Sequence, residues 1–206
     1  MFKKIALLTI LIATLALSAF APLTTASAAA PMTTTAWGET PTLPTEVGDA
    51  LQTQATAIAQ QATAIVAASQ QIQAYAAQIQ AAESNPTITS WAANIIALAA
   101  QTEQDAAAIV VTANDINTRI DNSEDTTLAL SDDIGEMADR IGEMADRILW
   151  TELQIGVMAD RIVESEYLIS DSSLNLAQMI ATNNNLLATN GNSIQVEVEA
   201  IRDLLP

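Results

Sequence analysis

The residues that most often carry chemistry in proteins are largely missing from this chain. Its 206 residues include no histidine and no cysteine, which removes the usual ligands of zinc and haem. The chain also lacks a glycine-rich phosphate loop and a G-x-S-x-G nucleophile motif. No isolated pair of acids lies on an otherwise apolar face, as acid–base catalysis would require. The sequence therefore predicts a protein that is not an enzyme and needs no cofactor.

One acidic segment has a spacing that suggests a metal site. Asp121, Ser123 and Asp125 follow the alternate spacing of a calcium-binding loop. Thr126, however, stands where that loop requires glycine, and no glutamate occupies its twelfth position. We interpret residues 121–127 as a solvated turn or helix surface and expect no metal there.

The first 44 residues have the features of an export signal followed by an arm. Lys3 and Lys4 precede an apolar run, which is followed by small residues at Ala26-Ser27-Ala28 that suit cleavage after Ala28 or Ala30, so residues 1–28 are predicted to be a secretory signal peptide. The predicted location is secreted: extracellular, on the cell surface or periplasmic. Residues 29–44 are rich in threonine and proline and predict a flexible arm. Trp37 in this arm is either a docking residue or an incidental exposed aromatic.

The net charge of the chain limits the kinds of partner that it can bind. Both lysines lie in the signal peptide, which leaves five arginines against 24 acidic residues and a net charge of about −19. Such a surface repels nucleic acid and anionic lipid head groups. We expect no nucleic-acid partner and no small-molecule substrate, whereas a membrane surface is a possible but disfavoured partner.

Residues 45–122 repeat isoleucine and alanine at helical spacing. One apolar residue returns every seven positions and an alanine usually follows it four places later, which predicts a narrow helical seam. The sequence Glu83-Ser84-Asn85-Pro86 ends the first helix, because the residue before proline is disfavoured in the helical region. We expect an antiparallel helical hairpin, whose larger seam residues are Leu51, Ile58, Ile65, Ile72 and Ile79, then Ile88, Ile95, Ile109 and Ile116.

Residues 123–189 predict one long heptad helix. The heptad of residues 134–140, IGEMADR, is repeated letter for letter at 141–147. Whether the chain turns or continues as helix at 121–127, and again at 183–192, is open at this stage. The predicted fold class is all-α, an elongated antiparallel hairpin plus a long heptad helix in a three- to four-helix bundle or coiled coil. The predicted self-association seam consists of Ile134, Met137, Ile141, Met144, Ile148, Ile155, Met158 and Ile162.

Three further sets of residues belong to this helix. Glycine inside a helix costs about 1 kcal/mol relative to alanine, so the repeated glycines either allow another backbone to approach or are merely copied with the heptad. The arginines are candidates for salt bridges between helices, with pairing inside their own helix as the alternative. The heptad of residues 148–154 adds a second apolar stripe, a candidate lateral contact. The sets are Gly135, Gly142 and Gly156; Arg140, Arg147 and Arg161; and Leu149, Trp150, Leu153 and Val157.

The functional prediction follows from the helices. Asn190-Gly191-Asn192 predicts a helix end, with a short C-terminal helix over 190–206. A long helix that overhangs its hairpin would leave apolar residues in water, so we expect a homo-oligomer or polymer. The predicted function is a secreted structural coiled-coil protein that self-assembles into an oligomer or filament of the cell envelope or matrix. The alternatives are an amphipathic helical protein that binds lipid or a membrane surface, and a stalk that presents the N-terminal arm.

Overall fold

Four long helices make up most of the described chain. The computed structural model describes residues 45–122 and 128–206, and that part contains no strand. The helices are α1 (Thr45–Ala82), α2 (Pro86–Asp121), α3 (Leu128–Glu164) and α4 (Asp171–Leu204), and a short 3₁₀ turn, η1 (Glu166–Leu168), precedes α4. The prediction of an all-α helical bundle is confirmed.

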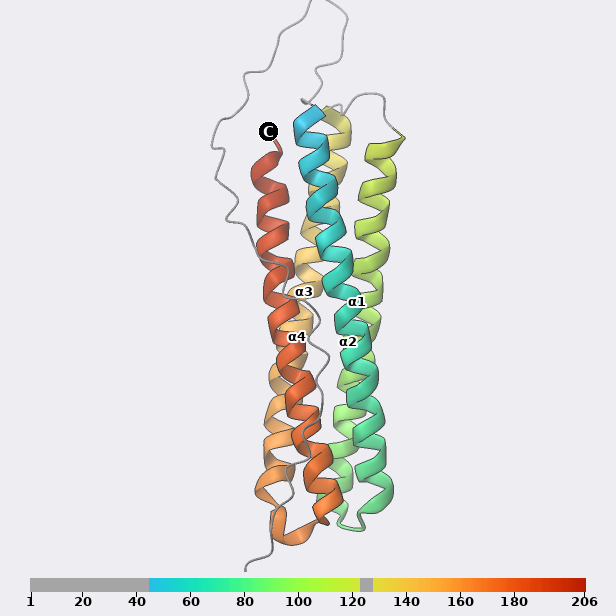
Figure 1. The fold of residues 1–206 in the computed structure, drawn as a ribbon, viewed down its shortest axis with the longest axis vertical. Helices are drawn as coiled ribbons and strands as arrows, with labels where there is room; N and C mark the ends of the chain where they lie inside the picture. The colour runs from blue at the N-terminus through green and yellow to red at the C-terminus, as the bar shows by residue number, and fades with distance from the viewer. Residues whose placement is uncertain (1–44, 123–127) are drawn as a thin grey trace, which may run out of the picture. The chain divides into compact units, whose positions relative to one another are not determined.

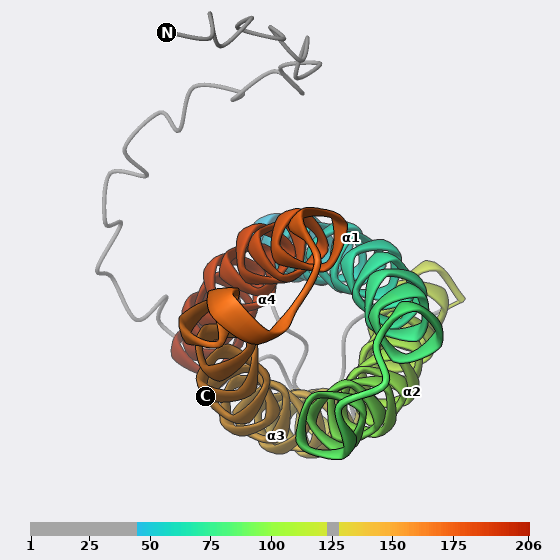
Figure 2. The ribbon, with the colours of Figure 1, turned by 90° about the horizontal axis from the view of Figure 1, so that it is seen from below.

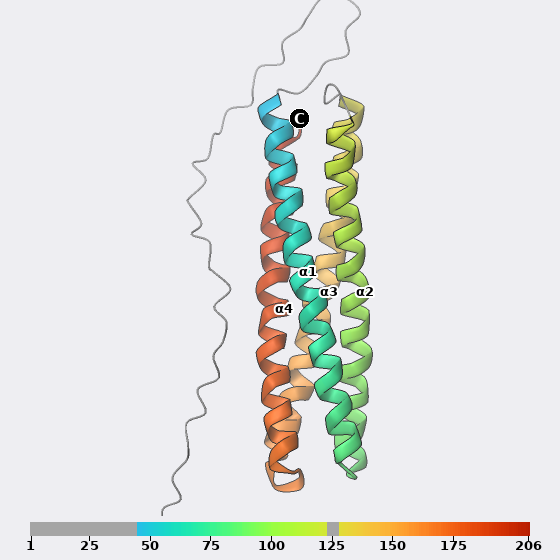
Figure 3. The ribbon, with the colours of Figure 1, turned by 45° about the vertical axis from the view of Figure 1, so that its right-hand side comes forward.

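The helices are arranged as a ring in which neighbours in sequence are neighbours in space. Each helix packs on two others: α1 on α2 and α4, and α3 on α2 and α4. The end-on view in Figure 2 shows this order around the bundle, and Figures 1 and 3 show that the helices run side by side in alternating directions. The result is an up-down-up-down four-helix bundle.

The core is built from the isoleucine and alanine positions that the heptad spacing predicts. All the larger seam residues of α1 and α2 are fully or almost fully buried, as are Ala55, Ala62, Ala92 and Ala99 between them. Alternating a large with a small side chain lets neighbouring helices interdigitate closely. Burial of this apolar surface, at about 25 cal/mol per Å², is the main force that holds the bundle together.

The turn between α1 and α2 lies where the sequence predicted it. Asn85 has extended backbone angles, φ −70° and ψ 119°, and its side chain accepts a hydrogen bond from the Thr87 amide at 2.9 Å. Pro86 occupies the first helical position, where its missing N–H leaves no intrahelical bond unmade. These two residues together end α1 and start α2.

The predicted helix over 123–189 is wrong, because the chain reverses at residues 165–170. Ser170 is the N-cap of α4, and its hydroxyl accepts from the Ser173 amide at 3.2 Å. Asp171 follows in the first turn, where negative charge suits the positive end of the helix dipole. The seven-residue spacing from Ile162 to Ile169 continues across this reversal in phase, so the lattice alone does not reveal it.

The predicted break at 190–192 is also wrong, because α4 continues through it. Asn190 and Asn192 donate side-chain hydrogen bonds to the carbonyls four residues earlier, Leu186 and Ala188, each at 2.8 Å. Gly191 is buried in the middle of the helix and packs against Leu149 of α3. The C-terminal helix therefore spans Asp171–Leu204 rather than 190–206.

The predictions for the signal peptide (1–28), the arm (29–44, with Trp37) and Ser123, Asp125 and Thr126 of the acidic segment lie outside the described residues. Within 45–122 and 128–206, no group of three or more acids is placed to hold a metal ion. No helix of the same ranges combines the length and apolar character that crossing a membrane requires.

Glu83 joins the end of α1 to the start of α4. Its Oε1 atom accepts hydrogen bonds from the Ser170 amide at 3.1 Å, the Ser170 hydroxyl at 2.9 Å and the Ser173 hydroxyl. The hydrogen bond from the Ser173 side chain, followed by that from the Ser170 backbone, lowers the pKa of Glu83. The ionised carboxylate is therefore stabilised by folding.

Removal of this charge is expected to weaken the bundle in a pH-dependent way. Because the folded pKa of Glu83 is lowered, its contribution to stability is present above the unfolded-state pKa and is lost as pH falls through the folded value. Glu83→Gln should cost about 1 kcal/mol at neutral pH and much less in acid. Urea denaturation at both pH values would measure this, and an equal loss at both would contradict it.

Candidate functional site

The predicted self-association seam lies inside the bundle. The five isoleucines of the set are fully buried, Met137 and Met144 are buried, and Met158 is partly buried against the same core. Helices α2 and α4, which pack on the two flanks of α3, belong to the same chain. The expectation of a long overhanging helix with an uncovered seam is therefore corrected, because α3 ends at Glu164 and α4 returns along it.

The repeated glycines of α3 face side chains of α4 and of Leu205, which directly follows α4. A methyl group at Gly135 would lie 3.5 Å from Leu205 Cδ1, and one at Gly142 would lie 3.5 Å from Val198 Cγ1. A methyl group at Gly156 would lie 3.1 Å from Asn184 Nδ2. Methyl groups at Gly135 and Gly142 would make only ordinary van der Waals contacts, so space alone does not require glycine there. Only at Gly156 would a methyl group be tightly packed, against the end of the Asn184 side chain.

The pattern reverses at one heptad. Leu149 occupies the position that is glycine at residues 135, 142 and 156, and Gly191 stands opposite it on α4. A methyl group at Gly191 would lie 2.9 Å from Leu149 Cδ2. Leu149, predicted to make a lateral contact, is therefore half-buried between α3 and α4 instead. At this level the large side chain therefore lies on α3 and the glycine on α4, whereas at the neighbouring heptads the glycine lies on α3.

The three candidate arginines of α3 behave differently from one another. Arg147 donates two hydrogen bonds to Asp105 of α2, from Nη2 at 2.7 Å and from Nε at 3.3 Å, so it forms a bridge between helices of one chain. Arg140 and Arg161 are exposed and form no ion pair with another described residue. They remain candidates for bridges to a partner.

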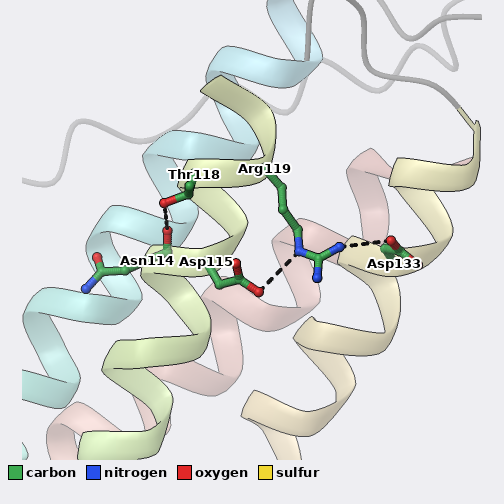
Figure 4. A network of polar contacts seen from close by, with 5 residues as sticks. All are labelled: Asn114, Asp115, Thr118, Arg119 and Asp133. Carbon is green, nitrogen blue, oxygen red and sulfur yellow. Dashed lines mark hydrogen bonds and ion pairs between the residues drawn. The ribbon is translucent and has the colours of Figure 1, made fainter. Parts of the chain in front are cut away.

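Two arginines outside the predicted set also join neighbouring helices. Figure 4 shows Arg119 near the end of α2, which pairs with Asp115 at 3.2 Å and with Asp133 of α3 at 3.0 Å, beside a hydrogen bond from the Thr118 hydroxyl to the Asn114 carbonyl. Arg202 of α4 pairs with Asp139 of α3 at 2.7 Å. The antiparallel order of the helices, once known, brings these residues to the same level.

The remaining three residues of the predicted lateral contact form an exposed apolar patch. Trp150, Leu153 and Val157 are 58%, 62% and 50% exposed, and their spacing places them on one face of α3. We call these three residues the α3 patch. Every other residue at the same heptad positions of this helix is acidic except Ala129 in its first turn; the acids are Asp132, Glu136, Asp139, Glu143, Asp146, Asp160 and Glu164.

Glu152, beside the patch, is partly buried against α4. Burial raises the pKa of its carboxyl group, and a hydrogen bond at 2.7 Å from Asn184 Nδ2 opposes that rise. Burial likewise raises the pKa of Glu197. Neither carboxylate has a positively charged partner within the described residues.

Neutralising Glu152 is expected to stabilise the bundle. Because its folded pKa is raised, the ionised form costs stability above the folded pKa, and this cost disappears below the unfolded value. Glu152→Gln can still accept the hydrogen bond from Asn184 and should raise the urea midpoint at neutral pH. The difference from wild type should vanish in acid, and a lower midpoint at neutral pH would contradict the prediction.

No protein family, curated protein or solved structure matches this chain. The fold and the exposed residues therefore define its class directly. It is a four-helix bundle whose core is closed by its own helices, with an apolar patch on the acidic outer face of α3.

Proposed function

We propose that this protein is a secreted, non-catalytic structural subunit that self-associates through the α3 patch into an assembly of the cell envelope or matrix. The observation that carries the proposal is the exposure of Trp150, Leu153 and Val157 at heptad positions where α3 otherwise carries acids, apart from Ala129 in its first turn. Clustered exposed apolar residues with a polar rim are typical of contact surfaces, and an aromatic residue often anchors them.

A second copy of this chain is the occupant that the charges favour. Arg140 and Arg161 lie on either side of the patch along α3 and form no ion pair with another described residue. The chain carries 24 acidic residues, so a neighbouring copy offers carboxylates to both arginines. Three side chains alone are too few for the roughly 1,200 Å² that a stable interface buries, so these flanking charges are part of the proposed contact.

Sedimentation of the secreted protein tests this proposal. We expect wild type to associate as concentration rises, and Leu153→Asp to shift it toward monomer by at least tenfold in apparent dissociation constant. Val111→Asp is the matched control, because Val111 is also an exposed apolar residue, at 69%, but lies on α2. Both variants should keep wild-type helicity in circular dichroism.

Three outcomes would count against the proposal. The first is a wild-type protein that stays monomeric at every concentration. The second is a Leu153→Asp variant that associates as well as wild type. The third is a Val111→Asp control that loses self-association as much as Leu153→Asp does. Flotation with lipid vesicles separates the membrane alternative: binding that Leu153→Asp abolishes, without self-association, would make lipid the occupant of the patch.

A further inference from the structure

The apolar core of this bundle repeats so regularly that it does not by itself determine how the helices align lengthwise. The heptads at 134–140 and 141–147 are identical, and α1 and α2 repeat isoleucine and alanine every seven residues. Sliding α3 by one heptad, about 10 Å along its axis, would restore nearly the same apolar contacts. Some other feature must distinguish the observed alignment.

Nine polar residues of the described chain are buried, and four of them, one on each helix, stand at positions that interrupt this repeat. Ser69 stands where α1 otherwise has alanine, and Thr102 stands where α2 otherwise has isoleucine. Thr151 occupies the position of Met137 and Met144 in α3. With Asn184 of α4, these residues are at most 3% exposed. We call Ser69, Thr102, Thr151 and Asn184 the central polar layer.

Contacts between helices place these four residues at one level. The Thr102 and Thr151 hydroxyls form a hydrogen bond of 2.7 Å between α2 and α3. Gln70 donates to Glu103 at 2.8 Å, which aligns the residues that directly follow Ser69 and Thr102. Asn184 donates to Glu152, the residue after Thr151. All four helices therefore carry one polar core residue in the same layer.

The layer does not act as a simple source of stability. Ser69 Oγ and Asn184 Oδ1 are buried and have no hydrogen-bond partner among the described residues. Buried polar atoms without partners oppose folding, whereas alanine or isoleucine would continue the core. Polar residues at core positions can nevertheless specify one alignment, because misaligned states lose their hydrogen bonds.

We propose that the central polar layer sets the lengthwise register of the bundle, with the Thr102–Thr151 hydrogen bond fixing α3 against α2. In a register shifted by seven residues, Thr151 lies opposite Ile95 or Ile109, and the bond between the hydroxyls is lost. Because each hydroxyl has one proton, one threonine donates to the other in the observed register. In the shifted register both donate to the carbonyls of their own helices, Leu98 for Thr102 and Ile148 for Thr151, and neither hydroxyl oxygen accepts a hydrogen bond from the other. The observed register is the one in which the two threonines meet.

The double variant Thr102→Val/Thr151→Val tests this device. Valine has the shape of threonine without the hydroxyl, so the variant should fold, with a melting temperature equal to or above that of wild type. The chain has no cysteine of its own, so spin labels can be attached specifically at Gln101→Cys on α2 and Gln154→Cys on α3, which are both exposed. Pulsed electron resonance then reports the distance between the labels.

We expect one distance in the labelled wild type and a second, longer one in the double variant, from molecules displaced by a heptad. Thr112→Val is the matched control, because Thr112 is buried and donates only to the Ala108 carbonyl of its own helix. It should keep the single distance. A single wild-type distance in the double variant would overturn the proposal, and so would a second distance in the control.

Discussion

Replacing Ile141 by aspartate is expected to unfold the bundle. Ile141 is fully buried in the α3 core, at the start of the second copy of the exact heptad, residues 141–147. The substitution removes about 1.5–3 kcal/mol of apolar burial and places an unpaired carboxyl group in the same space, at a further cost of several kcal/mol. The total approaches the whole stability of a typical domain, about 5–15 kcal/mol. Circular dichroism should show lost helicity and no cooperative melting transition.

The matched variant for this experiment is Leu153→Asp. It introduces the same charge into the same helix at a position that is 62% exposed. Helicity and melting temperature should remain near wild type, because the carboxylate stays in water. Together the two variants separate the core of α3 from its outer face, and a folded Ile141→Asp protein would show that the seam is not buried as described.

Gly191→Leu is expected to be the second most disruptive substitution. A methyl group at Gly191 would already lie 2.9 Å from Leu149 Cδ2 and 3.2 Å from its Cγ atom. A full leucine side chain must therefore push α4 away from α3, and overpacking of this kind typically costs about 1–3 kcal/mol. The free energy of unfolding from urea titration measures the loss, and an unchanged value would contradict the close packing of these helices.

A second substitution should restore much of that loss. Leu149→Gly alone leaves a space and adds a helical glycine, at a cost of about 1 kcal/mol for the glycine itself. Combined with Gly191→Leu, it recreates the arrangement of neighbouring heptads, in which Gly135 faces Leu205 and Gly142 faces Val198. The double variant should be more stable than the sum of the single losses predicts. Additive losses would show that the two residues do not act as a pair.

Much of the fold was predictable because one physical rule dominates it. Apolar residues at a seven-residue spacing must face inward on a helix, and the predicted isoleucine positions of α1, α2 and α3 are buried accordingly. The turn at Asn85-Pro86 was predictable because proline restricts the residue before it. Both signals are local and can be read without knowledge of neighbouring helices.

The second reversal was missed because tertiary contacts determine it. Residues 165–170 contain neither glycine nor proline, and the capture of Ser170 and Ser173 by Glu83 involves residues far apart in sequence. The Ser170 cap followed by Asp171 was the one local signal available. The helix end predicted at Gly191 was wrong for the same reason, because it too depends on a tertiary contact. A glycine can either end a helix or make room for a side chain of a neighbouring helix, and here the contact with Leu149 of α3 shows that it does the second.

Some residues of the candidate site were likewise predictable from local sequence, whereas others depend on how the helices are aligned. Trp150, Leu153 and Val157 were identified as a second stripe because they break the heptad, and they are exposed. The partner of Arg147 was not predictable, because Asp105 reaches it only once α2 and α3 are aligned. The seam was assigned to contacts between subunits because the length of α3 was overestimated, and with it the surface left uncovered.

Because α4 packs against α1, the helices form a closed ring of contacts, and the chain could begin at any of the four helices without changing which helices are neighbours. Joining Leu204 to Thr45 through a short linker and opening the chain between Ser84 and Asn85 would preserve the packing of each helix on its two neighbours and would leave both the Glu83 carboxylate and the Asn85 cap in the chain. Such a circular permutant would place the new ends at the opposite end of the bundle, beside the reversal between α3 and α4. Fusion partners could then be displayed from either end without altering the packed interior.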